Sequence, residues 1–172
     1  MKEVKGDDPA RLWERYIIAE CKQLYDLCIS DVRKNWEAPK VPGSHVSVEP
    51  SAPDFGGCAK VNGVGRSILF EAKYTEIDHR LPLANISDDQ KDDLITRAYL
   101  GGISFIYVCN SKYDKFIIPI NDLDNLVFPV DEKYLSPRKG SLLLLDECKK
   151  KPRETWLEFV ERNTDQEGRW TI

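Results

Sequence analysis

Histidines and paired cysteines are scarce in this sequence. Its 172 residues include two histidines, His45 and His79, which lie far apart in the chain, and five cysteines, none in a CxxC pair. Without such clusters, a histidine-based catalytic site and a cysteine-based zinc site are both poorly supported. We expect the histidines in surface loops and the cysteines as reduced, mostly buried thiols.

Long apolar runs and an excess of basic charge are absent as well. No segment approaches the roughly 18 consecutive apolar residues of a membrane span, and residues 1–5 lead into acidic side chains rather than into the apolar region of a signal peptide. We therefore expect no membrane partner and a cytoplasmic or nucleoid location. The formal net charge of -4 argues against a protein that coats nucleic acid, so contact with DNA would need a local basic face or metal ions.

Length and composition are those of one globular domain. Of the 172 residues, 41% are hydrophobic and 31% charged, close to ordinary soluble usage. A chain of this size can bury a substantial hydrophobic core. We expect residues 1–172 to form a single domain with one active site.

The first predicted helix has a clear start signal. Asp8 is suited to an N-cap and Pro9 to the first helical position, and apolar residues then recur near helical spacing over residues 10–35. Prolines and a glycine end the pattern, and a short strand is predicted at 46–48.

A hairpin is predicted next. Segments 54–61 and 66–73 flank the glycine-rich turn 62–65, so they should lie side by side. Because alternate residues of a strand face the same side, Glu71 and Lys73 project together while Ala72 points into the packed sheet.

The second half of the chain alternates helical and strand patterns. Ser87 is suited to an N-cap, with Gln90 three residues later as in a capping box, and this helix should run to about residue 100. The remaining predicted elements are central strands at 103–109 and 115–120, a strand at 141–145, and helices at 121–126 and 152–163.

Asp54, Glu71 and Lys73 supply the groups that metal-assisted phosphodiester cleavage requires. Two carboxylates can bind Mg²⁺ or Mn²⁺ while waters fill the other positions, and a lysine can position or help to deprotonate the attacking water. An isolated ExK pattern is more often a solvated surface pair. Here, however, Pro53-Asp54 comes first, a glycine turn follows, and the pattern emerges from an apolar run.

Several separate motifs follow one another in a recognisable order over residues 53–126. They are Pro53-Asp54-Phe55-Gly56-Gly57, Gly65-Arg66, Phe70-Glu71-Ala72-Lys73-Tyr74-Thr75, Leu81-Pro82-Leu83, Gln90 and Gly102-Ile103-Ser104-Phe105. In order and spacing they resemble the RecU family of Holliday junction resolvases, within the PD-(D/E)xK nuclease superfamily.

This resemblance implies a mixed α/β fold, with a restriction-endonuclease-like central sheet flanked by helices, and a set of site residues. Asp54 and Glu71 would bind the metal, Lys73 would be the catalytic lysine, and Gln90 would orient water or phosphate. Gln90 has an alternative role as a helix-capping residue. Glu14 would be the upstream acidic residue of the family, and Glu20 competes with it for that role.

The resemblance also implies a homodimer that resolves four-way DNA junctions by paired nicks, with Mg²⁺ as cofactor and Mn²⁺ as a substitute. Candidate DNA contacts are Arg66, Thr75, Lys60 and Lys34. The family carries a long basic stalk between its first two core strands, whereas only residues 46–53 are expected here, which favours a viral or otherwise divergent member. A phage-encoded member would act in the host cytoplasm. A less selective repair or restriction-type endonuclease and a non-catalytic junction-binding protein remain alternatives.

Overall fold

The computed structural model describes residues 8–35, 53–120 and 141–172. Within them, five strands form one sheet in the order β1-β2-β3-β5-β6, in which β3 and β5 run parallel and the other neighbours antiparallel. The predicted mixed sheet is therefore confirmed. The strands are β1 (Arg33–Lys34), β2 (Phe55–Val61), β3 (Val64–Thr75), β5 (Ile103–Asn110) and β6 (Lys115–Pro119).

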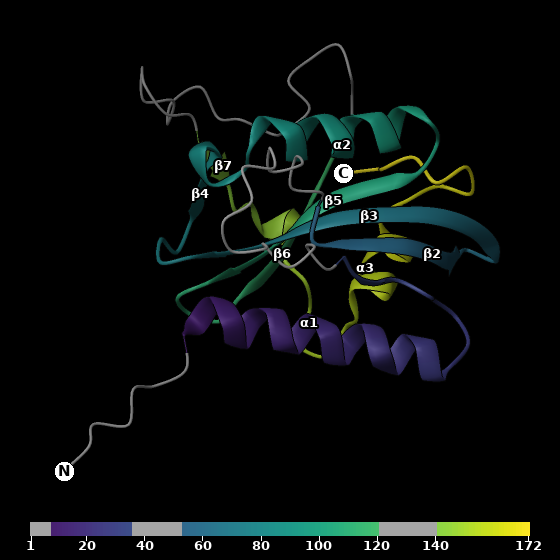
Figure 1. The fold of residues 1–172 in the computed structure, drawn as a ribbon, viewed down its shortest axis with the longest axis horizontal. Helices are drawn as coiled ribbons and strands as arrows, with labels where there is room; N and C mark the ends of the chain where they lie inside the picture. The colour runs from purple at the N-terminus through teal and green to yellow at the C-terminus, as the bar shows by residue number, and fades with distance from the viewer. Residues whose placement is uncertain (1–7, 36–52, 121–140) are drawn as a thin grey trace, which may run out of the picture.

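Helices cover both faces of this sheet. Figure 1 shows α1 (Pro9–Asp26) on one face and α2 (Asp88–Tyr99) on the other. Phe70 belongs to the hydrophobic cluster on the α1 face, which also holds Trp156 of α3 (Trp156–Arg162), whereas Leu69 belongs to the cluster under α2. Because side chains alternate along β3, its later odd-numbered residues point to the α2 face.

The first helix starts as predicted but ends earlier. The Asp8 side chain accepts a hydrogen bond from the Ala10 amide. The helix ends at Asp26 rather than near residue 35, because Cys28 takes a left-handed conformation with φ 59° and the Ile29 amide bonds back to the Leu24 carbonyl.

The early end of α1 also changes the position of the first strand. Residues 33–34, predicted as helix, form β1 and pair with the start of β2. Between the described strands β1 and β2 lie residues 35–54, of which 36–52 are outside the described residues. The expectation that only residues 46–53 separate the first two core strands therefore stays a prediction. The predicted elements at 46–48 and 121–126 also lie outside the described residues.

The hairpin is confirmed, with a tighter turn than predicted. Val61 pairs with Val64 across Asn62 and Gly63, whose φ angles are 48° and 83°. Positive φ at both central residues is typical of a type I′ turn, which favours Asn-Gly. The resulting register places Phe55 opposite Phe70, so Asp54 lies beside the middle of β3.

The later elements agree with prediction apart from their exact positions. β6 is the edge strand of the described sheet rather than a central one, and α3 begins at Trp156 rather than at residue 152 because Thr155 caps it through a capping box. A second small sheet joins β4 (Arg80–Pro82) to β7 (Ser141–Leu143).

Membrane and thiol expectations can be compared with the described part of the chain. None of its helices combines the length and apolar character needed to cross a lipid bilayer. All five cysteines are free thiols, as predicted, and most are buried. The buried ones are Cys21, Cys109 and Cys148, and the exposed ones are Cys28 and Cys58. The two short 3-10 helices span Leu83–Asn85 and Asp146–Cys148.

Candidate active site

Asp54 and Glu71 meet at the point where β2 begins. The Asp54 amide donates to Glu71 Oε2 at 3.0 Å, and Asp54 Oδ2 accepts from the Ala72 amide at 3.1 Å. Asp54 is therefore held against β3 through both its backbone and its side chain. The hairpin register brings together two carboxylates that are 17 positions apart in the sequence.

Lys73 lies beside Glu71 on the same side of β3. Its Nζ is 2.6 Å from Glu71 Oε1, and the two side chains are 18% and 2% exposed. The predicted common orientation of Glu71 and Lys73 is confirmed, and Ala72 packs on the other face as expected. Lys73 is the member of this pair that reaches solvent, so it is also the member that a substrate can approach.

Gln90 joins the cluster from α2, where it caps the helix and also contacts Glu71, so the two predicted roles do not exclude each other. Its Nε2 donates to Glu71 Oε1 at 2.7 Å, in a buried contact. Its Oε1 accepts from the Ser87 amide at 3.1 Å, which completes the predicted capping box. Lys73 Nζ lies 3.5 Å from the same oxygen, at the outer limit of a hydrogen bond.

Burial and a neighbouring charge make the Glu71 carboxylate hard to ionise. Burial raises the pKa of Glu71 to about 7, the negative charge of Asp54 adds to the increase, and Lys73 opposes it. Two close carboxylates in a poorly solvated position gain from a cation more than from a further hydrogen bond.

This donor set fits a hard divalent cation. Asp54 and Glu71 offer carboxylate oxygens, the ligands that Mg²⁺ and Mn²⁺ prefer, and the raised pKa of Glu71 shows that negative charge there lacks full compensation. Among the described residues, no three His, Cys, Asp or Glu side chains gather into a group that could hold a metal. Mg²⁺ is commonly bound through one or two carboxylates, with waters or substrate phosphate oxygens as its other ligands.

Comparison with known proteins identifies the family. The family model described as RecU, recombination protein U, matches residues 21–136, which include every residue of this cluster. The chain belongs to the RecU family. The predicted resemblance is confirmed, and membership places the chain among Holliday junction resolvases, a family whose function implies a nuclease that acts on branched DNA.

One solved structure adds a distant likeness. It is Hjc, a Holliday junction resolvase from the archaeal hyperthermophile Archaeoglobus fulgidus, which shares 13% identity over 77% of this chain and 87% of that chain, with a TM-score of 0.43. No curated protein matches the sequence.

Glu14 and Glu20, the candidates for the upstream acidic residue of the RecU family, do not contact this cluster. Glu14 forms an ion pair with Lys34 instead. Glu20 is buried, accepts from the Tyr107 hydroxyl at 3.1 Å and from the Trp156 amide at 3.0 Å, and so joins α1 to α3. Both contacts lie on the α1 side, because Tyr107 and Trp156 belong to the cluster on that face.

Two predicted DNA contacts have structural roles in this RecU-family chain. Thr75 is 4% exposed, and its hydroxyl donates to the Arg80 carbonyl at 3.1 Å and accepts from the Ile77 amide at 3.2 Å. Arg66 donates to the Gln166 carbonyl at 2.9 Å and so fastens the C-terminal segment to the hairpin. The Thr75 hydroxyl is thus engaged on both sides, whereas the Arg66 bond uses one of the five N–H donors of a guanidinium, so Arg66 as a DNA contact stays a prediction.

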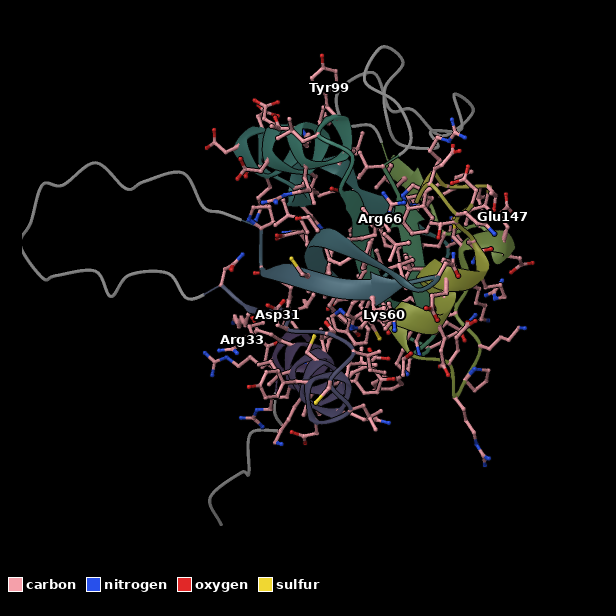
Figure 2. The ribbon with its side chains drawn as sticks, turned by 90° about the vertical axis from the view of Figure 1, so that its right-hand side faces the viewer. Asp31, Arg33, Lys60, Arg66, Tyr99 and Glu147 are labelled. Atoms are coloured by element: carbon pink, nitrogen blue, oxygen red, sulfur yellow. The ribbon has the colours of Figure 1, made fainter. Side chains whose placement is uncertain are left out.

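The other two predicted DNA contacts differ in accessibility. Lys60 is exposed on β2, and Figure 2 shows it with Arg66 on the hairpin. Lys60 lies six residues from Asp54, or about 20 Å along a strand, so it would contact a different part of a DNA arm. Lys34 is only partly exposed because its ammonium pairs with Glu14.

Sequence reasoning missed one residue at this site. The backbone N–H of Asn35 donates to the Asp54 carbonyl, and its side-chain amide donates to the Pro53 carbonyl, each at 2.7 Å. Nothing in the sequence distinguishes Asn35 from an ordinary loop asparagine, because its partners are 18 or more positions away.

Proposed function

We propose that this chain is a metal-dependent endodeoxyribonuclease that resolves four-way DNA junctions by paired nicks. The observation that carries the proposal is the convergence of Asp54, Glu71, Lys73 and Gln90 at one point on the α2 face of the sheet. Membership of the RecU family supports the substrate class.

The roles of the carboxylates follow from their chemistry. Asp54 and Glu71 would hold Mg²⁺, with Mn²⁺ as a substitute. When bound, the ion supplies a water of lowered pKa and neutralises charge that develops on the phosphate. Gln90 keeps Glu71 in place by donating to Oε1, and the capping box in turn fixes Gln90.

Lys73 would act on the substrate side of the site. Lys73 is the more exposed member of the Lys73–Glu71 pair, and its ammonium can donate to a phosphate oxygen or orient the attacking water. It also offsets part of the negative charge of Glu71, which keeps a doubly acidic site from repelling the DNA backbone.

The paired nicks imply two copies of the chain. The described residues of one chain form one such cluster, and one cluster can cut one strand at a time. We therefore propose a homodimer that presents two sites to opposing strands of a four-way junction. A nucleoid location, or the host cytoplasm for a phage-encoded protein, belongs to the same proposal.

The test is cleavage of a labelled four-way junction with Mg²⁺ by the wild type and by Asp54→Ala. We expect symmetric nicks from the wild type only, with junction binding retained by the variant because phosphate contacts dominate affinity. Equal cutting of a linear duplex would identify a less selective endonuclease. Binding without cutting would identify a junction-binding protein.

A further inference from the structure

Asn35 fastens the Pro53-Asp54 motif to the edge of the sheet. β1 has only two residues, and Asn35 directly follows it. The Asn35 amide donates to the Asp54 carbonyl at 2.7 Å, which extends the pairing of β1 with β2 by one step toward the site. The Asn35 side chain donates to the Pro53 carbonyl, also at 2.7 Å.

The Pro53 carbonyl matters because proline has no backbone N–H. Its carbonyl is the only main-chain group through which Pro53 can be hydrogen-bonded, and Asn35 uses it. Pro53 and Asp54 precede β2, so the regular pairing of β2 with β3 does not hold them. Without the side-chain amide of Asn35, Pro53 would have no hydrogen bond to the sheet among the described residues.

Gly56 leaves the space in which the Asn35 side chain lies. A Cβ at Gly56 would stand 3.3 Å from Asn35 Nδ2, which is tighter than ordinary contact, and 3.6 Å from Asn35 Oδ1, which is an ordinary contact. The glycine next to the motif therefore admits this side chain, and any larger residue would push against it.

We propose that Asn35 is a positioning residue that sets the Asp54 carboxylate for cation binding, an inference that rests on the proposed function. The Asp54 amide, carbonyl and Oδ2 bond to Glu71, Asn35 and Ala72 in turn. Asn35 supplies the contacts on the β1 side, and β3 supplies the others. Loss of the Asn35 side chain keeps the backbone bond to the Asp54 carbonyl but removes the bond to the Pro53 carbonyl. The chain just before Asp54 is then less fixed, so the Asp54 carboxylate spends less time in the position that binds a cation.

The experiment measures Mn²⁺ binding by the full chain without DNA, from the paramagnetic resonance signal of free Mn²⁺. We expect Asn35→Ala to weaken Mn²⁺ binding about tenfold, the usual effect of removing a residue that orients a metal ligand. In cleavage assays the half-saturating Mg²⁺ concentration should rise by about the same factor, with the rate at saturating Mg²⁺ little changed.

Two further variants isolate positioning from other causes. Ser30→Ala is the matched control, because Ser30 Oγ donates to the Cys58 carbonyl at 3.3 Å and so joins the same two segments away from Asp54. It should leave Mn²⁺ binding unchanged. Asn35→Asp keeps the size of the side chain but cannot donate to Pro53. Positioning predicts weaker Mn²⁺ binding by this variant, whereas a simple effect of added negative charge predicts tighter binding.

The outcomes separate this inference from the proposed function. If Asp54→Ala binds Mn²⁺ as well as the wild type does, the metal site itself is wrong and the role of Asn35 falls with it. If Asp54→Ala loses Mn²⁺ but Asn35→Ala binds it normally, the proposed function stands and Asn35 is not a positioning residue. Equal losses in Ser30→Ala and Asn35→Ala would also overturn the role of Asn35.

Discussion

The side-chain amide of Gln90 donates to the Glu71 carboxylate at 2.7 Å while its oxygen caps the helix that carries it. One residue thus links the start of α2 to the middle of β3. Ser87 shares the cap but does not contact Glu71, since its hydroxyl accepts from the Gln90 amide. The two functions of Gln90 can therefore be separated by mutation.

Ser87→Ala should lower stability and spare cleavage. Loss of the cap costs about 1 kcal/mol, but the Gln90 contact with Glu71 does not depend on the Ser87 hydroxyl. Gln90→Ala removes both contacts, so we expect a similar loss of stability together with a fall in nicking rate of about tenfold. Thermal unfolding and single-turnover nicking measure the two effects. Similar nicking by both variants would contradict an orienting role for Gln90.

Lys73→Ala should abolish nicking without weakening metal binding. Lys73 contributes charge toward the substrate, and its removal leaves the two carboxylates more negative, so Mn²⁺ affinity should hold or rise. The nicking rate should fall by about 100-fold or more. Lys91→Ala is the control, because Lys91 is the next residue after Gln90 and pairs with Asp88 away from the carboxylates. A normal nicking rate in Lys73→Ala would refute the site assignment.

Metal binding should weaken below about pH 7. The pKa of Glu71 is raised to about 7, so between its usual range and pH 7 the folded protein binds a proton that the unfolded chain has lost. The free energy of unfolding of the metal-free protein should therefore fall as pH rises through this window. A cation requires the ionised carboxylate, and its apparent affinity should drop about tenfold from pH 8 to pH 6.

The measurement is the rise in unfolding temperature on addition of a fixed Mn²⁺ concentration at pH 6 and pH 8. A larger rise at pH 8 is expected for the wild type. In Glu71→Gln the side chain is uncharged at both pH values. The rise in unfolding temperature should therefore differ less between pH 6 and pH 8 in this variant than in the wild type. An equal rise at both pH values in the wild type would show that Glu71 does not bind the cation.

Thr75 and Lys60 should respond to mutation in opposite ways. Thr75→Val leaves the partly buried Ile77 amide without its partner and should cost about 1 kcal/mol of stability with unchanged junction affinity. Lys60→Ala should leave stability unchanged and, if Lys60 contacts a phosphate, reduce the salt dependence of junction binding by about one unit of slope. Reduced junction affinity in a folded Thr75→Val protein would restore Thr75 as a DNA contact.

The sequence predicted the elements whose signals are local. The Asn62-Gly63 turn set the hairpin and its register, and Ser87 with Gln90 marked the start of α2. The end of α1 had no such signal, because a cysteine rarely takes the left-handed conformation that Cys28 has. Because of this turn, residues 33–34 form β1 instead of the predicted helix.

The candidate site was predictable to the extent that it depends on the hairpin. Glu71 and Lys73 share a face through strand periodicity, and Asp54 follows from the register. The contacts of Glu14 and Asn35 depend on where β1 lies after α1 ends, which residue patterns alone did not indicate. Gln90 was assigned two competing roles because sequence spacing does not show that one amide group can cap α2 and reach Glu71 at the same time.

Cleavage of a labelled four-way junction beside a linear duplex with the same arms tests the central claim most directly. The assay uses wild type and Lys73→Ala, each with Mg²⁺ and with EDTA. We expect the wild type to nick the junction symmetrically only when Mg²⁺ is present and to leave the duplex uncut. Lys73→Ala should not nick the junction. Equal cutting of both substrates, or nicking that persists in EDTA or in Lys73→Ala, would contradict the central claim.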